Sequence, residues 1–375
     1  MRKGCWLILF GALSATVFAS GAVDTGKWRK YRTQHVTILS AASERATRNW
    51  VVEFEQIYAA LTNMFSKVGT DQPPLTVLLF DDKETFGQYT PMNEGKARDV
   101  AGYFVRVSDR GYVALNIADD RQETRRVIYH EAVHWFFSAS PVLRPVWLEE
   151  GLAELFSTAR IKDQEFRFGD YIEGNLQILQ GGSGMTLAQM FAVTPESREY
   201  NESTRATSFY ATAWVFLHYL VCGDKGGGFP ALSKFLGLLD EEMTPVEAFT
   251  KAFGRNYETM DHEINEYVHH GKFTIFRRKF DPLILAGSLK PVPLSADELN
   301  LELGFLLAIT QRFDQAKPLL ERLVQKMPQD PRVHEALGFL AVQAGIARRH
   351  RCILAGRWNW DHGVTTATSV QPWLS

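Results

Sequence analysis

From residue 28 to residue 117, the hydrophobic positions of this chain follow two alternating periods. Short apolar runs with a period of two are typical of strands, whereas hydrophobic positions three or four residues apart are typical of amphipathic helices. The predicted strands are 35–39, 74–80, 102–105 and 111–117, and the predicted helices are 44–65 and 83–89. We therefore expect a small mixed sheet subdomain over 28–117.

From about residue 120 to residue 285 the pattern is mainly helical. The apolar segment 126–137 contains no glycine or proline. A connector with two prolines follows, so one helix should end near Ser140 and another begin near Val146. Residues 205–220 are apolar on nearly every face, which predicts a central buried helix. Further helices are expected at 185–191, 245–253 and 257–270. The predicted fold class is α+β.

A sequence repeat follows a proline-containing linker at 286–296. The tetrapeptide Leu-Gly-Phe-Leu occurs at 303–306 and again at 337–340, a spacing of 34 residues. This spacing resembles the tetratricopeptide repeat, a helix-turn-helix module. Residues 297–345 hold only about one and a half such repeats, so they must dock on the rest of the protein to be stable. We expect residues 346–375 to form an irregular tail.

Composition narrows the class of protein. The chain is 45% hydrophobic and 22% charged with a net charge of −2, which is typical of a globular protein and argues against a nucleic-acid partner. Cys222 and Cys352 do not make a disulfide framework. They could form one bridge, but the apolar surroundings of Cys222 favour a buried free thiol.

Residues 1–22 have the pattern of a secretory signal peptide. The chain begins with basic residues, which are followed by an apolar run at 5–18 and by small residues at 19–22. The apolar run is short for a membrane span. We expect cleavage after Ala19 or Ala22 and an exported protein with no stable membrane span. The alternative is an uncleaved N-terminal anchor.

The chemistry-bearing motif is His130-Glu131-Ala132-Val133-His134, an HExxH pattern inside the apolar segment 126–137. Residues four apart share a helix face, so His130 and His134 can present two imidazoles to one cation. A catalytic zinc takes three protein ligands and a water, so a third ligand is needed.

The segment Trp147-Leu148-Glu149-Glu150-Gly151-Leu152-Ala153-Glu154 supplies candidates for this third ligand. Glu150 and Glu154 share a helix face, whereas Glu149 is out of phase with Glu154. This phase favours Glu150, and Glu149 remains the alternative ligand.

Together, HEAVH and WLEEGLAE resemble the active-site signature of the gluzincin metallopeptidases, most closely the peptidase-MA-like branch. The resemblance covers residues 23–285 and implies that Glu150 is the third zinc ligand and that Glu154 orients His130. It also implies that zinc lowers the pKa of a water and that Glu131 is the general base that takes its proton.

The family also has a tyrosine at the start of a later helix that faces the zinc. Tyr210 is the matching position and could donate to the oxyanion. The alternative is a tyrosine that packs in the core. His218, two turns further on, is interpreted as structural. In the family an edge strand pairs with the substrate backbone, and 112–116 occupy that place. The alternative is a strand that only completes the sheet.

The resemblance therefore implies an exported zinc metallopeptidase, periplasmic or secreted and from a bacterium, that acts on a peptide or protein substrate. No exopeptidase signature is visible, so an endopeptidase is the default expectation. The repeat segment offers a surface for a protein partner. The competing hypothesis is a catalytically inactive zincin domain that acts, with the repeat segment, as a protein-binding module.

Overall fold

The computed structural model describes most of the chain after residue 24. The described residues are 25–65, 72–93, 96–98, 100–107, 109–118, 121–138, 145–162, 164–201, 203–223, 227–281 and 289–354, without side chains at 93, 121–124, 201, 203–206 and 346–354. The predicted signal peptide at 1–22 lies outside this range. Within it the fold is α+β, and no helix is long and apolar enough to cross a membrane.

A five-stranded mixed sheet with the order β1-β2-β3-β7-β6 forms the centre of the molecule. Its strands are β1 (Arg29–Arg32), β2 (Val36–Ser40), β3 (Leu75–Phe80), β6 (Gly102–Val107) and β7 (Arg110–Asn116). Strands β2, β3 and β7 are parallel, and β1 and β6 run antiparallel at the two edges. The four predicted strands are thus confirmed.

The edge strand differs from the prediction. Strand β7 holds the residues 112–116 that we expected at the edge, but it lies between β3 and β6. The reason is the short connection after β6, which folds that strand back into a hairpin with Val107 opposite Arg110. The alternative, that 112–116 complete the sheet, is therefore correct, and the edge strand on this side of the sheet is β6.

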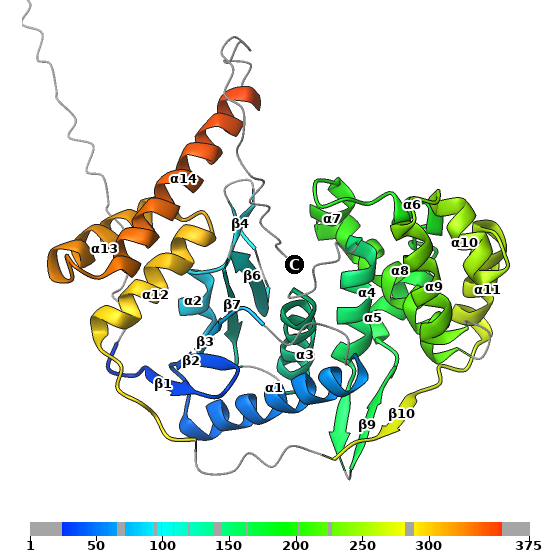
Figure 1. The fold of residues 1–375 in the computed structure, drawn as a ribbon, viewed down its shortest axis with the longest axis horizontal. Helices are drawn as coiled ribbons and strands as arrows, with labels where there is room; N and C mark the ends of the chain where they lie inside the picture. Colours follow the sequence, from blue (N-terminus) through cyan, green and yellow to red (C-terminus); the bar gives the residue numbers. More distant parts are fainter. Residues whose placement is uncertain are drawn as a thin grey trace, which may run out of the picture.

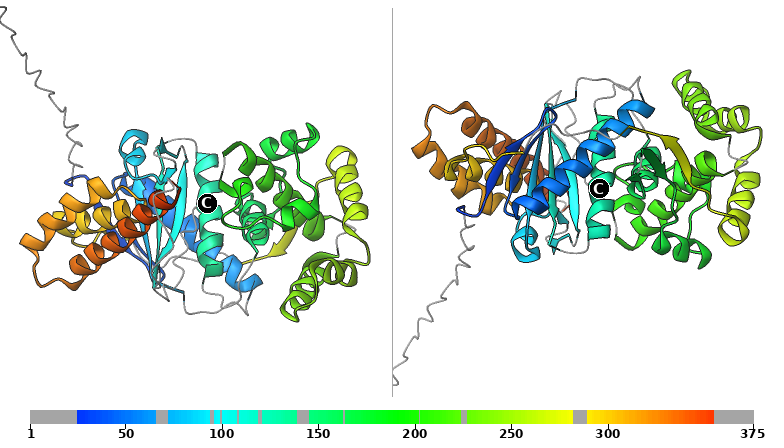
Figure 2. Two further views of the ribbon diagram at one scale, coloured as in Figure 1. Left: turned by 90° about the horizontal axis from the view of Figure 1, so that it is seen from above. Right: turned by 90° about the horizontal axis from the view of Figure 1, so that it is seen from below.

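Helices cover both faces of the sheet (Figures 1 and 2). Side chains alternate along β3, so Val77 and Leu79 join one hydrophobic core while Leu78 and Phe80 join the other. The first core contains α1 (Glu44–Met64) and α3 (Arg121–Ser138), and the second contains α2 (Lys83–Gly87) and the C-terminal helices. The helices predicted at 44–65 and 83–89 are confirmed within a few residues.

A mainly helical block packs against α3 on the side away from the C-terminal helices (Figure 2). Its centre is the pair α4 (Val146–Ser157) and α8 (Ser203–Cys222). A Cβ atom at Gly151 would lie 2.7 Å from the Ala213 carbonyl oxygen, so glycine is what allows these two helices to approach so closely.

The remaining elements of this block surround that pair. They are β8 (Arg160–Lys162), β9 (Glu165–Phe168), α5 (Glu173–Gln180), α6 (Leu187–Phe191), α7 (Arg198–Asn201), α9 (Gly228–Asp240), α10 (Pro245–Phe253), α11 (Tyr257–His270) and β10 (Phe276–Lys279). A small pair, β4 (Met92–Asn93) with β5 (Lys96–Ala97), belongs to the sheet half. Cys222, at the end of α8, is a free and partly buried cysteine.

The repeat segment forms three helices that dock on the outer face of the sheet. These are α12 (Ala296–Ile309), α13 (Phe313–Lys326) and α14 (Pro331–Leu354). Phe305 packs against Tyr112 of β7 with ring centroids 5.4 Å apart, and the Tyr112 hydroxyl donates to Glu302 at 2.9 Å. The predicted start of the irregular tail at 346 is wrong, because α14 continues to Leu354. No proline interrupts the chain between Gly345 and that residue.

Candidate metal centre

Helix α3 presents two histidines to the helical block. His130 and His134 lie one turn apart, their ring centroids are 4.8 Å apart, and their Nε2 atoms are separated by 3.1 Å. The surrounding residues Tyr129, Val133 and Trp135 are buried, which fixes the rotation of the helix about its axis. The apolar pattern of 126–137 therefore determines where the two imidazoles point.

Helix α4 brings Glu150 to both imidazoles. Its Oε2 atom lies 3.5 Å from Nε2 of His130 and 3.5 Å from Nε2 of His134, and the side chain is only 1% exposed. Oε2 is buried and makes no hydrogen bond to a described residue, whereas Oε1 accepts a 2.8 Å hydrogen bond from the Tyr200 hydroxyl. A buried carboxylate oxygen without a hydrogen bond is costly unless a cation occupies the space before it.

The three ligand atoms fit a single metal ion. Two nitrogens each about 2.0–2.1 Å from a tetrahedral zinc would lie about 3.3 Å apart, close to the observed 3.1 and 3.5 Å separations. Among the described residues, His130, His134 and Glu150 form a group whose ligand atoms all lie within 4.8 Å of one another. Glu149, the alternative ligand, is not part of that group.

Electrostatic attraction holds Glu150 close to His130 and His134. Burial would lower the pKa of His130, but the Glu150 carboxylate 3.5 Å away and the other neighbouring carboxylates raise it to about 9. The pKa of His134 is raised for the same reason, mainly by Glu150. Burial would raise the pKa of Glu150, yet both histidines hold it well below its usual value. The negative charge of Glu150 therefore favours positive charge at the two imidazoles, which is the charge that a cation would supply.

Glu131 lies beside the histidines and faces the sheet. Its side chain is buried, with 4% of the residue exposed, and its carboxylate accepts a hydrogen bond from the Phe104 backbone N–H of β6. Burial raises the pKa of Glu131, and the two histidines oppose that rise. A buried carboxylate with a raised pKa is suited to accept and release a proton.

Glu154 lies behind His130, on the side away from Glu150. Its Oε1 is 3.5 Å from Nδ1 of His130, and its Oε2 accepts a 3.3 Å hydrogen bond from Asn175 Nδ2. The Arg126 guanidinium is 3.8 Å from the same oxygen. The carboxylate is therefore anchored on two sides while it faces the imidazole, the arrangement that typically orients a metal-ligating histidine.

Two tyrosines, Tyr200 and Tyr210, lie close to Glu150. Tyr200 was not anticipated from the sequence; it is 4% exposed and comes from the four-residue helix α7, within a stretch that reads as a polar loop. Tyr210 of α8 is partly buried, and its ring centroid is 6.3 Å from that of Tyr200. Burial, and then the charge of Glu150, raise the pKa of both phenols well above the usual value, so both stay protonated.

His218 lies away from this group. It is fully buried, its Nε2 is 2.7 Å from the Gly169 carbonyl oxygen, and its Nδ1 is 2.9 Å from the Tyr267 hydroxyl. With Nε2–H donating and Nδ1 accepting, a neutral ring satisfies both contacts. These contacts support the structural interpretation of His218.

No protein-family model matches this chain, and no curated protein is detectably similar to it. The chemistry of the centre must therefore be inferred from its own geometry.

Proposed function

We propose that this protein is an exported zinc-dependent metallopeptidase with a zincin-type domain over residues 23–285. The proposal rests chiefly on one observation, the convergence of the buried Glu150 Oε2 on the Nε2 atoms of His130 and His134, 3.5 Å from each. Export rests on the predicted signal peptide at 1–22.

The donor set favours zinc. Two imidazole nitrogens and one carboxylate oxygen are a known ligand set for catalytic zinc, which keeps a further position for water. When bound, zinc would lower the pKa of that water toward neutrality and polarise a substrate carbonyl.

Glu131 is the general base of this proposal. It would take a proton from the attacking water and pass it to the leaving amine, so that the peptide C–N bond breaks with a new C–O bond formed. Tyr210, with its phenol protonated near Glu150, would donate a hydrogen bond to the oxygen on which charge develops. Glu154 would keep the His130 ring in orientation.

The sheet offers a place for an extended substrate. β6 is an edge strand, and the Phe104 N–H in its centre already donates to Glu131. A peptide that adds to this edge by main-chain hydrogen bonds would lie beside the general base. Such pairing uses the main-chain N–H and C=O groups of the substrate and not its side chains. It therefore favours a peptide or protein substrate over a small ester.

The competing function is protein binding without hydrolysis. The hydrophobic residues of α12–α14 pack on the sheet, which supports a structural role for the repeat segment. A protein partner of that segment would have to use its remaining outer surface. The two functions differ in whether a metal-loaded protein cleaves peptides.

The test is digestion of an unbiased peptide library by the zinc-loaded protein, read by mass spectrometry. We expect cleavage at internal bonds, and loss of about two to four orders of magnitude of activity in Glu131→Gln with the metal retained. Glu149→Gln, the same change one residue from Glu150, should cleave like the unmodified protein. Full activity in Glu131→Gln would refute the assigned base, and a zinc-loaded protein that cleaves nothing would favour the binding module.

A further inference from the structure

A polar cavity lies on the side of α3 where α1 and the β8–β9 hairpin meet this helix. Its volume is about 600 Å³, within the usual range for small-molecule sites. The charged residues that line it are four cations and two acids: Arg125, Arg160, Lys162 and Arg167 with Glu53 and Glu165. The lining thus carries two more positive than negative charges.

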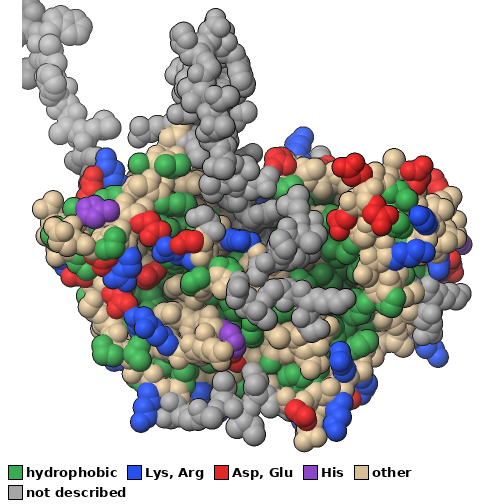
Figure 3. Space-filling model, viewed as in Figure 1, with side chains coloured by type: hydrophobic (Ala, Val, Ile, Leu, Met, Phe, Trp, Pro, Cys, Tyr) green, Lys and Arg blue, Asp and Glu red, His purple; other side chains and the backbone are tan. Residues whose placement is uncertain are grey.

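The sheet register concentrates arginines at this place. Arg160 of β8 is directly opposite Arg167 of β9, which is directly opposite Arg277 of β10. Residues opposite one another point to the same face, so three guanidinium groups stand in a row. Like charges in such positions destabilise a sheet unless an anion lies between them. Lys and Arg side chains are prominent in this part of the surface, at the lower right of Figure 3.

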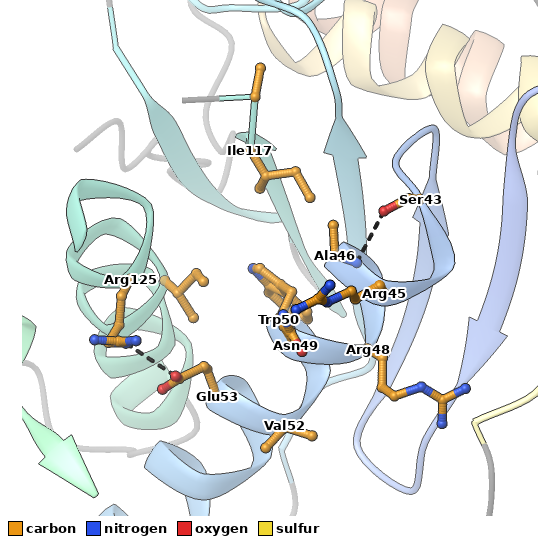
Figure 4. Close-up of a pocket in the computed structure, with 12 residues that line it drawn as sticks. Ser43, Arg45, Ala46, Arg48, Asn49, Trp50, Val52, Glu53, Ile117 and Arg125 are labelled. Atoms are coloured by element: carbon orange, nitrogen blue, oxygen red, sulfur yellow. Dashed lines mark hydrogen bonds and ion pairs between the residues drawn. The ribbon is translucent and has the colours of Figure 1, made fainter. Parts of the chain in front are cut away.

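The two acids of the cavity already have partners other than Arg160. Glu53 of α1 accepts a 3.1 Å hydrogen bond from Arg125 Nε and a second one from the Tyr129 hydroxyl. Figure 4 shows this Arg125–Glu53 pair from the side of a neighbouring cavity. Glu165 lies 3.3 Å from Arg277 Nη1. Neither acid therefore neutralises Arg160.

Arg160 itself has an unsatisfied donor. Its Nη1 atom is buried and makes no hydrogen bond to any described residue. A buried guanidinium nitrogen without an acceptor carries a large desolvation cost, because charged donors lose their strongest hydrogen bonds on leaving water. An oxyanion beside Arg160 and Arg167, which both line the cavity, would offset the repulsion between them.

We propose that this cavity binds a small molecule bearing a phosphate group, held mainly by Arg160 and Arg167. The planar fork of a guanidinium matches two oxygens of a phosphate, and two neighbouring guanidinium groups suit a dianion better than a single carboxylate.

The cavity lies between the sheet half of the protein and the helical block. Glu53 and Arg125 come from the two helices that pack on the sheet, whereas Arg160 and Arg167 come from the hairpin of the helical block. A phosphate between them would hold the two halves of the protein together next to Tyr129, the residue before His130. This site is independent of the proposed metal centre.

The neighbouring cavity of Figure 4 is a weaker candidate. It is also lined by arginines, but Arg48 pairs with Glu44 at 2.7 Å, Arg125 with Glu53, and Arg45 is exposed. No arginine there combines burial with an unsatisfied donor.

The test is calorimetric titration of the full chain with inorganic phosphate and with glycerol 3-phosphate at constant ionic strength, beside flotation with phosphatidylglycerol vesicles. We expect saturable binding of one phosphate group per chain and a ligand-dependent rise in Tm. Arg160→Gln and Arg167→Gln should each weaken binding by at least about tenfold. Arg278→Gln, on the other face of β10, should bind like the unmodified protein.

Far-ultraviolet circular dichroism of each variant shows whether it is folded. If Arg160→Gln does not fold, Arg160→Lys replaces it in the binding test. Arg160→Lys keeps the charge but loses the planar fork, so it should bind with intermediate affinity. Three results would overturn the proposal. They are no saturable phosphate binding, equal weakening in Arg278→Gln and Arg160→Gln, or binding to vesicles without binding to free phosphate.

Discussion

The Tyr200 hydroxyl donates a 2.8 Å hydrogen bond to Oε1 of Glu150, and through it fixes which carboxylate oxygen faces the histidines. With Oε1 held, Oε2 lies 3.5 Å from both imidazole nitrogens and has no other hydrogen bond among the described residues. Both side chains are buried, so water cannot replace this contact easily. Tyr200 therefore acts as a positioning residue for the proposed third ligand.

Replacing Tyr200 by Phe should weaken zinc binding without unfolding the protein. Loss of a hydrogen-bond partner behind a metal ligand typically lowers metal affinity by about 10- to 100-fold. Competition with a chromophoric chelator measures this affinity directly. Tyr219→Phe is a matched control, because its hydroxyl donates to Glu263 at 2.8 Å away from the metal centre. Equal affinities in Tyr200→Phe and Tyr219→Phe would remove the positioning role.

His218 should make stability depend on pH. Burial lowers its pKa in the folded state, whereas the unfolded chain has a pKa of about 6.5. Below that value the unfolded state binds the proton and the folded state resists it, so the stability present above about pH 6.5 falls as the pH decreases. The slope reaches at most about 1.4 kcal/mol per pH unit for one proton.

Urea unfolding of the metal-free protein between pH 5 and pH 8 measures this slope. Other groups also titrate, so the comparison is with His218→Gln, whose stability should fall less steeply below pH 6.5. His262→Gln, at an exposed position on α11, should retain the slope of the unmodified protein. Parallel curves for all three proteins would show that His218 carries no such proton linkage.

Phe305 should anchor the C-terminal helices to the sheet. It is 5% exposed and lies between Tyr112 and Phe339, with ring centroids 5.4 and 5.1 Å away. Truncation of a buried phenylalanine typically costs about 3–5 kcal/mol, so Phe305→Ala should lower the free energy of unfolding by about that amount. Val342→Ala, at a position that is 57% exposed, should change it little. A cost below about 1 kcal/mol in Phe305→Ala would mean that this contact does not hold the helices in place.

Local patterns account for the parts of the fold that the sequence predicts. Helices α10 and α11 match their predicted ranges, because Thr244 and Pro245 mark a helix start and the hydrophobic period is regular. Helix periodicity also places His130 and His134 on one face of α3 and Glu150 in phase with Glu154 on α4, whereas the approach of Glu150 to the histidines depends on how these two helices pack.

Long-range contacts account for what the sequence does not predict. The position of β7 inside the sheet depends on which strands pair, and the hydrophobic pattern of 111–117 suits an edge or an interior strand equally. Tyr200 reaches Glu150 of α4 only because of the way α7 packs against α8, and nothing in its neighbours marks it as buried. The row of Arg160, Arg167 and Arg277 depends on the register of β8, β9 and β10, which the sequence does not predict. The alternation Glu165-Phe166-Arg167-Phe168 is its one local signal.

The measurement that tests the central claim most directly is the metal content of the purified protein after chelation and reloading with zinc, determined by elemental analysis. We expect one zinc per chain in the unmodified protein and in Glu149→Ala, and none in Glu150→Ala, with all three proteins folded. Absence of zinc from the folded unmodified protein, or loss of zinc in Glu149→Ala but not in Glu150→Ala, would contradict the proposed His130–His134–Glu150 centre.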